Sequence, residues 1–404
     1  MSAWREMMLG EICGLKAGSV FKLNSQGRKT GDYPFVKVSD MNLAGNEIYI
    51  RVANNWIIEE ERTSLRVNVH PKGATVLAKI GIALTYNRRR LLVRETVVDN
   101  NMMSAIPKAE KVDSRFFYYA LCKVDLNEIA QGSALPYLTN EAINKLQILL
   151  PPLPEQRAIA AVLGSLDDKI ELNRRMNETL EALAQSLFKS WFVDATQSAL
   201  PKGWRYATIA ELCEINSWTL GKGDELDRIE YVEISEVMRG NIANIQSYAR
   251  GEEPSRARRR LRHGDTVLST VRPDRGAYFL CLNPSPNLIG STGFAVLTPK
   301  KAPWSFIHAA MTQTDVFEYL GQQADGGAYP AVRPEIIGAL EVPWPSKPEL
   351  VEVFHRACAP LYERAELNRQ ESRTLAALRD ALLPKLLSGE LRVPAAAKIT
   401  EAAA

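Results

Sequence analysis

The chain has 404 residues, which is enough for two or three domains that each bury a core of their own. Its composition is that of an ordinary globular protein, with 46% hydrophobic and 24% charged residues, and this excludes wholesale disorder and a collagen-like fibre. The formal net charge is only +3, so the charge of the whole chain does not by itself indicate a nucleic-acid-binding protein.

The cysteines and the start of the chain predict a reduced, cytoplasmic protein. Five scattered cysteines form neither a CxxC pair nor an even disulfide framework, and no signal-peptide pattern opens the sequence. The longest uncharged run, residues 276–299, contains Asn283-Pro284-Ser285-Pro286-Asn287 at its middle. Such a segment breaks a helix, so we predict a turn between two strands there and no association with a membrane.

Two long helical regions separate two globular parts. Residues 151–200 and 343–395 are nearly free of Gly and Pro after opening proline runs, because proline is tolerated before or in the first turn of a helix and not inside it. Residues 1–150 and 201–342 are predicted to form the globular modules, and residues 396–404 a disordered tail.

Strand and helix patterns are mixed within each module. Runs rich in Val, Ile and aromatic residues predict strands at 35–39, 74–78, 231–235 and 266–269, and helical patterns cover 114–122 and 304–320. The predicted fold class is α+β, with two mixed α/β modules joined by two long helices. The order of the strands does not follow from these patterns.

The chain contains an internal repeat with a period of about 195 residues. This period is far too long for a solenoid unit, so it indicates a duplicated module and a pseudo-two-fold arrangement. The matching blocks are Trp4-Arg5 with Trp204-Arg205, residues 35–40 with 231–236, residues 132–136 with 326–330, and Glu171-Leu172-Asn173-Arg174 with Glu366-Leu367-Asn368-Arg369.

Both helical regions carry the same apolar stripe at 4-3 heptad spacing, which predicts that the two helices pack as an antiparallel coiled coil. The alternative is that each helix folds back onto its own module. The stripe includes Leu163, Leu166, Ile170, Leu180, Leu187 and Trp191 in the first helix and Leu361, Leu375, Leu382 and Leu386 in the second.

Polar residues interrupt the stripe at Asn173 and Asn368. They could fix the register as buried polar groups or belong to a solvated surface, and the sequence leaves both interpretations open. Further apolar residues beside the stripe suggest contact with the helices of another protein. They are Leu172, Met176, Leu183 and Phe188 in the first helix and Leu367, Leu378 and Leu383 in the second.

The motifs of catalysis are missing, so we predict no catalytic site, cofactor site or metal site in this chain. There is no GxxxxGK[ST] sequence, and Gly221-Lys222-Gly223 lacks the third glycine of a dinucleotide site. The histidines His70, His263, His308 and His355 have no ligand-spaced partners.

Two local arginine clusters, one in each module, are candidates for DNA binding, because arginine presents a planar fork to phosphates and to guanine. Solvated charged faces are the alternative. The first cluster follows the predicted strand at 74–78, whereas the second precedes the predicted strand at 266–269, so the two modules would read different sequences. The candidates are Tyr86, Arg88, Arg89, Arg90 and Arg94 in the first module and Arg256, Arg258, Arg259, Arg260, Arg262, Arg272 and Arg275 in the second.

The order of modules and helices, together with three motifs, resembles the DNA-specificity (S) subunits of type I restriction-modification enzymes. The motifs are Leu150-Pro151-Pro152-Leu153-Pro154-Glu155-Gln156-Arg157, Lys189-Ser190-Trp191-Phe192-Val193-Asp194 and Leu386-Leu387-Ser388-Gly389-Glu390-Leu391. The second helical region opens with Pro343-Trp344-Pro345 in place of the fuller first motif.

The resemblance implies two target recognition domains, at 1–150 and 201–342, that each read half of a bipartite site in double-stranded DNA. It implies helical spacers, at 151–200 and 343–395, that dock two methyltransferase subunits. These partners would methylate adenine with S-adenosylmethionine, and restriction subunits driven by ATP with Mg ions would join them. The alternative function is a stand-alone two-module DNA-binding regulator that dimerises through its helices.

Overall fold

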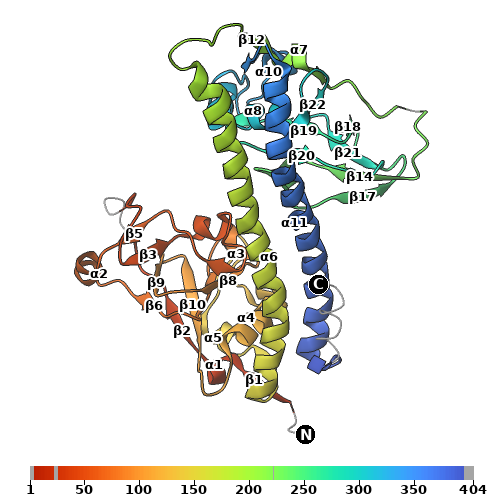
Figure 1. Cartoon of the computed structure of the whole chain (residues 1–404). Helices are drawn as coiled ribbons and strands as arrows, with labels where there is room; N and C mark the ends of the chain where they lie inside the picture. Colours follow the sequence, from red (N-terminus) through yellow and green to blue (C-terminus); the bar gives the residue numbers. More distant parts are fainter. Residues whose placement is uncertain (1–3, 22–25, 222, 395–404) are drawn as a thin grey trace. The chain divides into compact units, whose positions relative to one another are not determined.

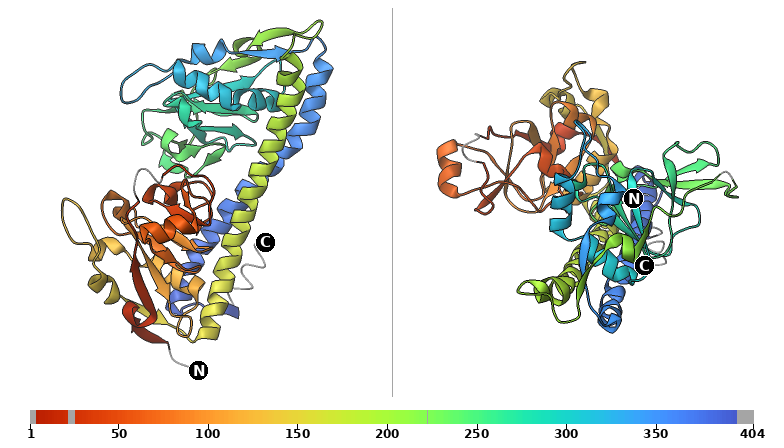
Figure 2. Two further views of the ribbon diagram at one scale, coloured as in Figure 1. Left: turned by 90° about the vertical axis from the view of Figure 1, so that its left-hand side faces the viewer. Right: turned by 90° about the horizontal axis from the view of Figure 1, so that it is seen from above.

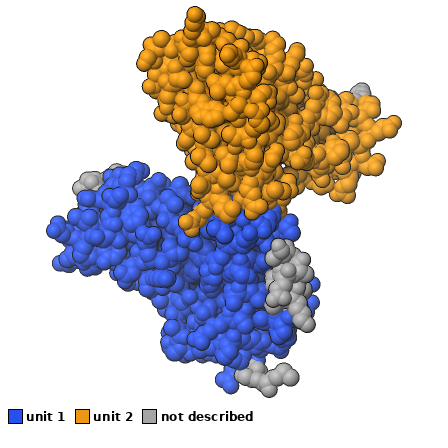
Figure 3. Space-filling view, in the orientation of Figure 1, with its two compact units in different colours: residues 1–174, 371–404 blue, residues 175–370 orange. Residues whose placement is uncertain are grey.

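The computed structural model describes residues 4–21, 26–221 and 223–394. The predicted tail at 396–404 lies outside the described residues. The chain forms two compact units, residues 1–174 with 371–404 and residues 175–370 (Figure 3). Each unit therefore contains one globular module together with a part of each long helix. None of the described helices combines the length and the apolar character needed to cross a membrane.

The module of unit 1 is built on two sheets (Figure 1). One has the strand order β2-β10-β7-β8-β4 and the other the order β5-β3-β9-β6, while β1 and β11 form a separate antiparallel pair. The strands are β1 (Arg5–Met8), β2 (Cys13–Ala17), β3 (Tyr33–Val36), β4 (Tyr49–Ile50), β5 (Trp56–Ile57), β6 (Val69–His70), β7 (Thr75–Ala78), β8 (Arg89–Leu92), β9 (Thr96–Val98), β10 (Met102–Pro107) and β11 (Gln147–Leu150). The helices are α1 (Leu9–Ile12), α2 (Glu59–Leu65), α3 (Ile82–Thr85), α4 (Ser114–Lys123) and α5 (Asn140–Asn144), with 3-10 turns at Val38–Asn42 and Leu126–Ile129.

The module of unit 2 repeats this plan. Its sheets have the orders β13-β22-β19-β20 and β17-β14-β21-β18, with β12 and β23 as an antiparallel pair and β15 with β16 as a small hairpin. The strands are β12 (Arg205–Thr208), β13 (Cys213–Ile215), β14 (Arg228–Val232), β15 (Val237–Met238), β16 (Asn241–Ile242), β17 (Gln246–Ala249), β18 (Ala257–Arg260), β19 (Asp265–Ser269), β20 (Tyr278–Cys281), β21 (Leu288–Ser291), β22 (Phe294–Pro299) and β23 (Glu341–Trp344). The helices are α7 (Ile209–Leu212), α8 (Trp304–Met311), α9 (Thr314–Gln322) and α10 (Pro334–Gly338), with 3-10 turns at Ile234–Glu236 and Pro273–Arg275.

The local predictions agree with these elements in most places. The segment around Asn283 is the turn between β20 and β21, as predicted. The helical pattern at 304–320 is divided into α8 and α9 at Thr312 and Gln313. The predicted α+β class is confirmed by the mixture of helices and sheets in both modules.

The long helices are α6 (Leu153–Phe188), which continues into a π-helical turn at Lys189–Val193 and a 3-10 turn at Asp194–Thr196, and α11 (Pro348–Ser388). Within unit 1 the two helices run antiparallel, because Asp167 bonds to Arg379 while Asn173, further along α6, bonds to Glu371. Within unit 2 Asn177 bonds to the carbonyl of Ala365. The left-hand view of Figure 2 shows the two helices side by side.

The helices also form part of the core of each module. In unit 1, Leu163, Leu166 and Leu382 share one buried cluster with Phe116 and Tyr119 of α4. In unit 2, Phe188 and Phe354 share a cluster with Phe306 of α8. The helices therefore pack on each other and on the module of the same unit, so the two packing arrangements considered for them occur together.

Candidate nucleic-acid interface

One arginine of the first cluster is buried inside the module and hydrogen-bonded there. Arg89 on β8 is only 2% exposed, and its guanidinium donates to the backbone carbonyls of Asn87 and Val124. Burial lowers its pKa from the ordinary value. Our assignment of Arg89 to a DNA-binding surface is therefore wrong, because side chains alternate along a strand and this one faces inward.

Arg90, the next residue on β8, is half-buried. Its Nη2 and Nε donate to the carbonyl of Met41 at 2.9 and 3.2 Å, and its Nη1 to that of Arg89 at 2.8 Å. Burial lowers the pKa of this guanidinium too. Arg90 ties β8 to the turn at Val38–Asn42, which leaves little of its hydrogen-bonding capacity for a ligand.

The remaining members of the first cluster reach the surface. Tyr86 is 60% exposed, and the guanidinium of Arg88 lies 4.7 Å from the centre of its ring. Arg94 is exposed, with its guanidinium 5.7 Å from the ring centre of Trp56. Tyr86, Arg88 and Arg94 thus form the accessible part of this cluster.

The second cluster is organised around a tryptophan that the sequence did not single out. Trp218 is half-buried, and the guanidinium groups of Arg260 and Arg262 lie 3.9 and 4.6 Å from its ring centre. Arg260 also pairs with Asp224. Such stacking holds arginine side chains in fixed positions and contributes about 0.5–1 kcal/mol at an exposed site.

The backbone brings Trp218 to these arginines. The amide of Leu220 donates to the carbonyl of Arg258 at 2.8 Å, and that of Arg260 to the carbonyl of Trp218 at 3.1 Å. The pairing joins segments about 40 residues apart in sequence, and no local pattern could have indicated it. Arg258 and Arg259 are half-buried, and burial lowers the pKa of Arg259.

Other arginines of the second cluster differ in their exposure. Arg256, Arg262 and Arg275 are exposed. Arg272 is half-buried, with its guanidinium 4.9 Å from the ring centre of Tyr329 and a 2.7 Å hydrogen bond to the carbonyl of Ala328. The second cluster therefore contains more exposed arginines than the first.

The two clusters lie on strands that are not equivalent. β8 pairs with β7 in one sheet of unit 1, and its counterpart in the strand order of unit 2 is the apolar strand β20. β18 pairs with β21 in the other type of sheet, and its counterpart in unit 1 is β6. The same scaffold thus carries its arginines on different sheets.

The polar residues of the apolar stripe are buried. Asn173 is 0% exposed and donates from Nδ2 to Glu371 Oε2 at 2.7 Å. Asn368 is 1% exposed and donates to Asn177 Oδ1 at 2.8 Å. Of the two interpretations of these asparagines, the solvated surface is wrong and the buried polar position is correct.

The candidate partner-contact residues divide by burial. Leu163, Leu166, Leu375, Leu382 and Leu386 are buried, and Ile170, Leu180, Leu187, Trp191 and Leu361 are half-buried, so they serve mainly the packing within their unit. Phe188 is 2% exposed and lies in the aromatic core of unit 2, so it is not available to another protein. In contrast, Leu172, Leu183 and Leu367 are 49%, 48% and 56% exposed.

Each unit also has buried titratable groups. Asp167 is 1% exposed and accepts from Tyr119 Oη at 2.5 Å and from Arg379 Nη1 at 2.7 Å. Burial raises the pKa of this carboxyl, while Arg379 and Tyr119 act in the opposite direction. Burial lowers the pKa of His70 to about 4 and that of His308 to about 3, so both are neutral at physiological pH.

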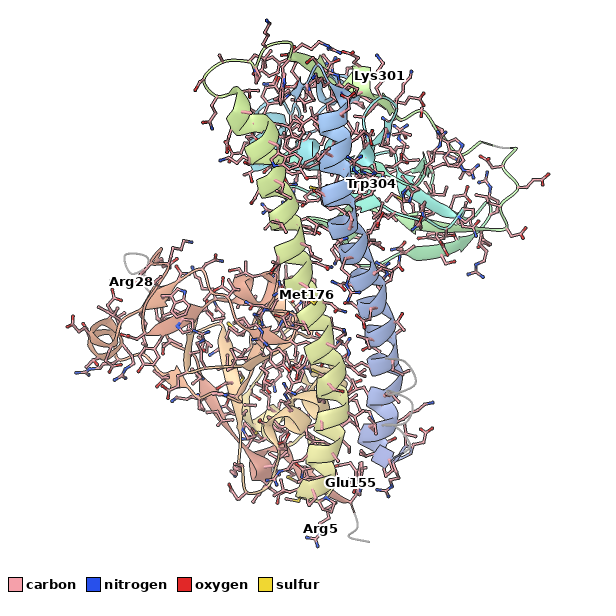
Figure 4. The ribbon with its side chains drawn as sticks, in the orientation of Figure 1. Arg5, Arg28, Glu155, Met176, Lys301 and Trp304 are labelled. Carbon is pink, nitrogen blue, oxygen red and sulfur yellow. The ribbon has the colours of Figure 1, made fainter. Side chains whose placement is uncertain are left out.

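The ends of the helices carry further contacts, and Figure 4 labels two of the residues that make them, Glu155 and Trp304. Glu155, in the first turn of α6, accepts from the indole Nε1 of Trp4 at 3.0 Å and from Arg392 at 2.5 Å. Trp304, at the start of α8, lies with its ring centre 5.4 Å from that of His355 on α11. Within the described ranges, no three His, Cys, Asp or Glu side chains are grouped as metal ligands would be.

Comparison with known proteins gives consistent matches. Residues 1–182 match the family model described as the type I restriction modification DNA specificity domain. The type I restriction enzyme MjaIX specificity subunit of Methanocaldococcus jannaschii is 25% identical, over 95% of this chain and 92% of its own length. The HindI specificity subunit of Haemophilus influenzae is 25% identical over 73% of this chain and 81% of its own length. The crystal structure of a type I restriction-modification S subunit from M. genitalium has the same fold, with a TM-score of 0.55 and 17% identity over 95% of this chain and 96% of that one.

Proposed function

Because the chain belongs to the family of type I restriction-modification specificity subunits, we propose that its two modules are target recognition domains for an asymmetric, bipartite site in double-stranded DNA. The observation that carries this proposal is that the two clusters lie on or beside strands that are not equivalent in otherwise matching sheets, β8 in unit 1 and β18 in unit 2. Two identical modules would read two identical half-sites. Modules that present arginine from different sheets read different half-sites.

The proposed DNA-binding surface consists of the accessible members of the two clusters. Arginine at these positions supplies positive charge for phosphates and a planar pair of donors for guanine O6 and N7. The stacked arrangement of Arg88 on Tyr86 and of Arg262 on Trp218 fixes these groups before DNA arrives. The surface comprises Tyr86, Arg88 and Arg94 in unit 1 and Arg256, Arg258, Arg262, Arg272 and Arg275 in unit 2.

The exposed leucines of the long helices suit the docking of partner proteins. Leu172, Leu183 and Leu367 are each about half exposed and lie beside the apolar stripe of the long helices. We assign them to contacts with two methyltransferase subunits, with restriction subunits joining that complex. The chemistry then belongs to the partners, which would use S-adenosylmethionine, ATP and Mg ions, and this chain needs no cofactor.

The proposal is tested by expressing the chain with and without the methyltransferase encoded in its source genome. We expect the purified chain to neither methylate nor cut DNA, and the complex to methylate adenines in a two-part, gapped sequence. Adenine methylation mapped across the genome identifies that sequence. A chain that binds a two-part site as a dimer, and neither binds nor activates a methyltransferase, would instead be a stand-alone regulator.

A module exchange tests whether each module reads its half-site independently of the other. Replacing residues 1–150 with the corresponding part of another family member should change one half of the methylated sequence and leave the other half intact. A change in both halves would contradict the assignment of one half-site to each module.

A further inference from the structure

Both units contain the same seven-residue hairpin loop, held by matching backbone contacts. In unit 1 the loop closes where Gln131 pairs with Tyr137, and the amide of Gly81 donates to the carbonyl of Pro136 at 2.8 Å. In unit 2 it closes where Asp325 pairs with Ala331, and the amide of Arg272 donates to the carbonyl of Pro330 at 2.7 Å. Gly81 and Arg272 therefore occupy equivalent positions.

Both residues have a positive φ. Gly81 has φ 79° and ψ −170°, a region open mainly to glycine, whereas Arg272 has φ 47° and ψ 56°, in the left-handed region that a non-glycine residue enters at a cost. Arg272 also precedes Pro273, and the residue before a proline is restricted to extended conformations by the proline ring. Unit 2 thus carries an arginine with a positive φ where unit 1 has a glycine, and glycine is the residue that adopts a positive φ without strain.

The contacts of the Arg272 side chain within the protein are weak. Its guanidinium stacks at 4.9 Å on the ring of Tyr329, which is 72% exposed, and uses one donor for the carbonyl of Ala328 among the described residues. An exposed stacking contact of this kind stabilises less than a left-handed non-glycine residue before proline costs. Intramolecular packing alone therefore does not account for this arginine.

We propose that Arg272, held over Tyr329, contacts duplex DNA in the half-site read by unit 2. This inference rests on the proposed function. The ring and the Ala328 carbonyl restrict the long side chain to one position, which lowers the entropy lost when its remaining donors bind a phosphate or a guanine edge. The exposed Arg275 lies three residues further along the same turn. Unit 1 has Gly81 and Leu135 at the corresponding positions, so the contact belongs to one half-site only.

The test separates an effect on stability from an effect on DNA binding. Arg272→Gly removes the backbone strain at residue 272, and it also removes the side chain that would contact DNA. The probe is a duplex with the two-part site defined by adenine methylation, and the protein is the full chain in complex with its methyltransferase. We expect the melting temperature of Arg272→Gly to rise by about 2 °C. We expect its affinity for the duplex to fall about tenfold. Selection on randomised DNA should retain the half-site of unit 1 and relax that of unit 2.

Asn283→Gly is the matched control, since Asn283 is another exposed, left-handed residue of unit 2, with φ 49°. It should leave DNA affinity unchanged. Tyr329→Ala removes the ring on which Arg272 stacks and leaves the arginine in place. It should weaken binding of the duplex about threefold. If both Arg272→Gly and Tyr329→Ala bind the duplex like the wild type, or if they weaken binding of the methyltransferase instead, the inference is wrong. Failure of the wild-type complex to bind the duplex would contradict the proposed function itself.

Discussion

The two units attach their modules to the helix pair with different chemistry. In unit 1 the apolar contact includes a buried polar group, with Asp167 on α6 bonded to Tyr119 of α4 and to Arg379 of α11. In unit 2 the corresponding position on α11 holds Tyr362, whose ring centre lies 4.9 Å from that of His308 and 6.0 Å from that of Trp304, both of α8. One scaffold thus tolerates two kinds of core, provided that each is complete.

The difference can be followed at single positions of the repeat. Asp167 and Arg379 of unit 1 correspond to Tyr362 and Ala184 of unit 2, which are 3% and 0% exposed. An ion pair at this place must be well hydrogen-bonded to offset the desolvation of both charges, whereas the Tyr and Ala pair carries no charge. The comparison teaches that at this position unit 1 depends on specific bonds and unit 2 on packing, while both units have an apolar core around it.

Both units have the same contact between a glycine turn of the module and an arginine of a long helix. Gly45, with φ 85°, lies against the guanidinium of Arg174, and Gly240, with φ 84°, lies against that of Arg369. Both arginines end a Glu-Leu-Asn-Arg block of the repeat, and each pairs with the glutamate three residues earlier. The repeat therefore retains a common contact between a glycine turn and the helix.

The largest effect should come from Arg379→Ala, which leaves Asp167 buried without its cation. We expect a loss of about 3–5 kcal/mol in the free energy of unfolding of unit 1, because an unpaired buried charge is strongly unfavourable. Hydrogen exchange of α4 would measure it separately from unit 2. Arg356→Ala, at an exposed position of the same helix, is the control. The double substitution Asp167→Leu with Arg379→Met should recover much of the lost stability, because it leaves no unpaired charge. Equal losses in the single and double variants would contradict the role of the buried ion pair in unit 1.

A second prediction concerns pH and unit 2 alone. Burial raises the pKa of Asp265 on β19 to about 6, and unit 1 has Ala74 at the equivalent position. Because the folded state favours the protonated carboxyl, its stabilising contribution is complete below about pH 4 and is lost as the pH rises through 6. Asp265→Asn should therefore be more stable than the wild type at pH 8, by on the order of 2–3 kcal/mol, and nearly equal to it at pH 4.

Denaturant unfolding of unit 2 at several pH values would measure this difference. Asp274→Asn, which changes an exposed carboxylate of the same unit, should show no such pH dependence. A stability difference between Asp265→Asn and the wild type that stays constant from pH 4 to pH 8 would contradict the prediction.

The same tyrosine substitution should have opposite signs in the two units. Tyr119 donates to the carboxylate of Asp167, so Tyr119→Phe should destabilise unit 1 by about 1.5–3 kcal/mol. The hydroxyl of Tyr362 is buried and has no hydrogen-bond partner among the described residues, so Tyr362→Phe should stabilise unit 2 by about 1 kcal/mol. Calorimetry on both variants checks this, and equal signs would mean that the two cores do not differ as described.

The smallest effects should be shared by the two units. Gly45→Ala and Gly240→Ala each place a Cβ at a positive φ and within 3.0 and 3.2 Å, respectively, of an arginine Nη2. Each should cost about 1–2 kcal/mol. Gly14→Ala, where an added Cβ meets no atom within 4 Å, is the control. A cost in only one unit would show that the glycine turn is not a common contact.

Several features of this protein follow from the sequence alone. The proline runs and heptad spacing predict α6 and α11, the Asn283 segment predicts a turn between strands, and the repeat predicts two related modules. These features depend on neighbours in the chain or on periodicity, because φ restriction by proline and the alternation of polar and apolar residues act over short distances.

The tertiary structure alone decided which residues of the candidate interface are accessible. Arg89 and Arg88 are adjacent in a basic run, yet one is buried and the other stacks on an exposed ring. Trp218 became part of the interface through strand-like pairing with Arg258 and Arg260, and the amide of Arg272, a left-handed residue, bonds to the distant Pro330. Each depends on backbone pairing between segments distant in sequence, whose register is set by the burial of whole sheet faces and is not encoded in any local run of residues.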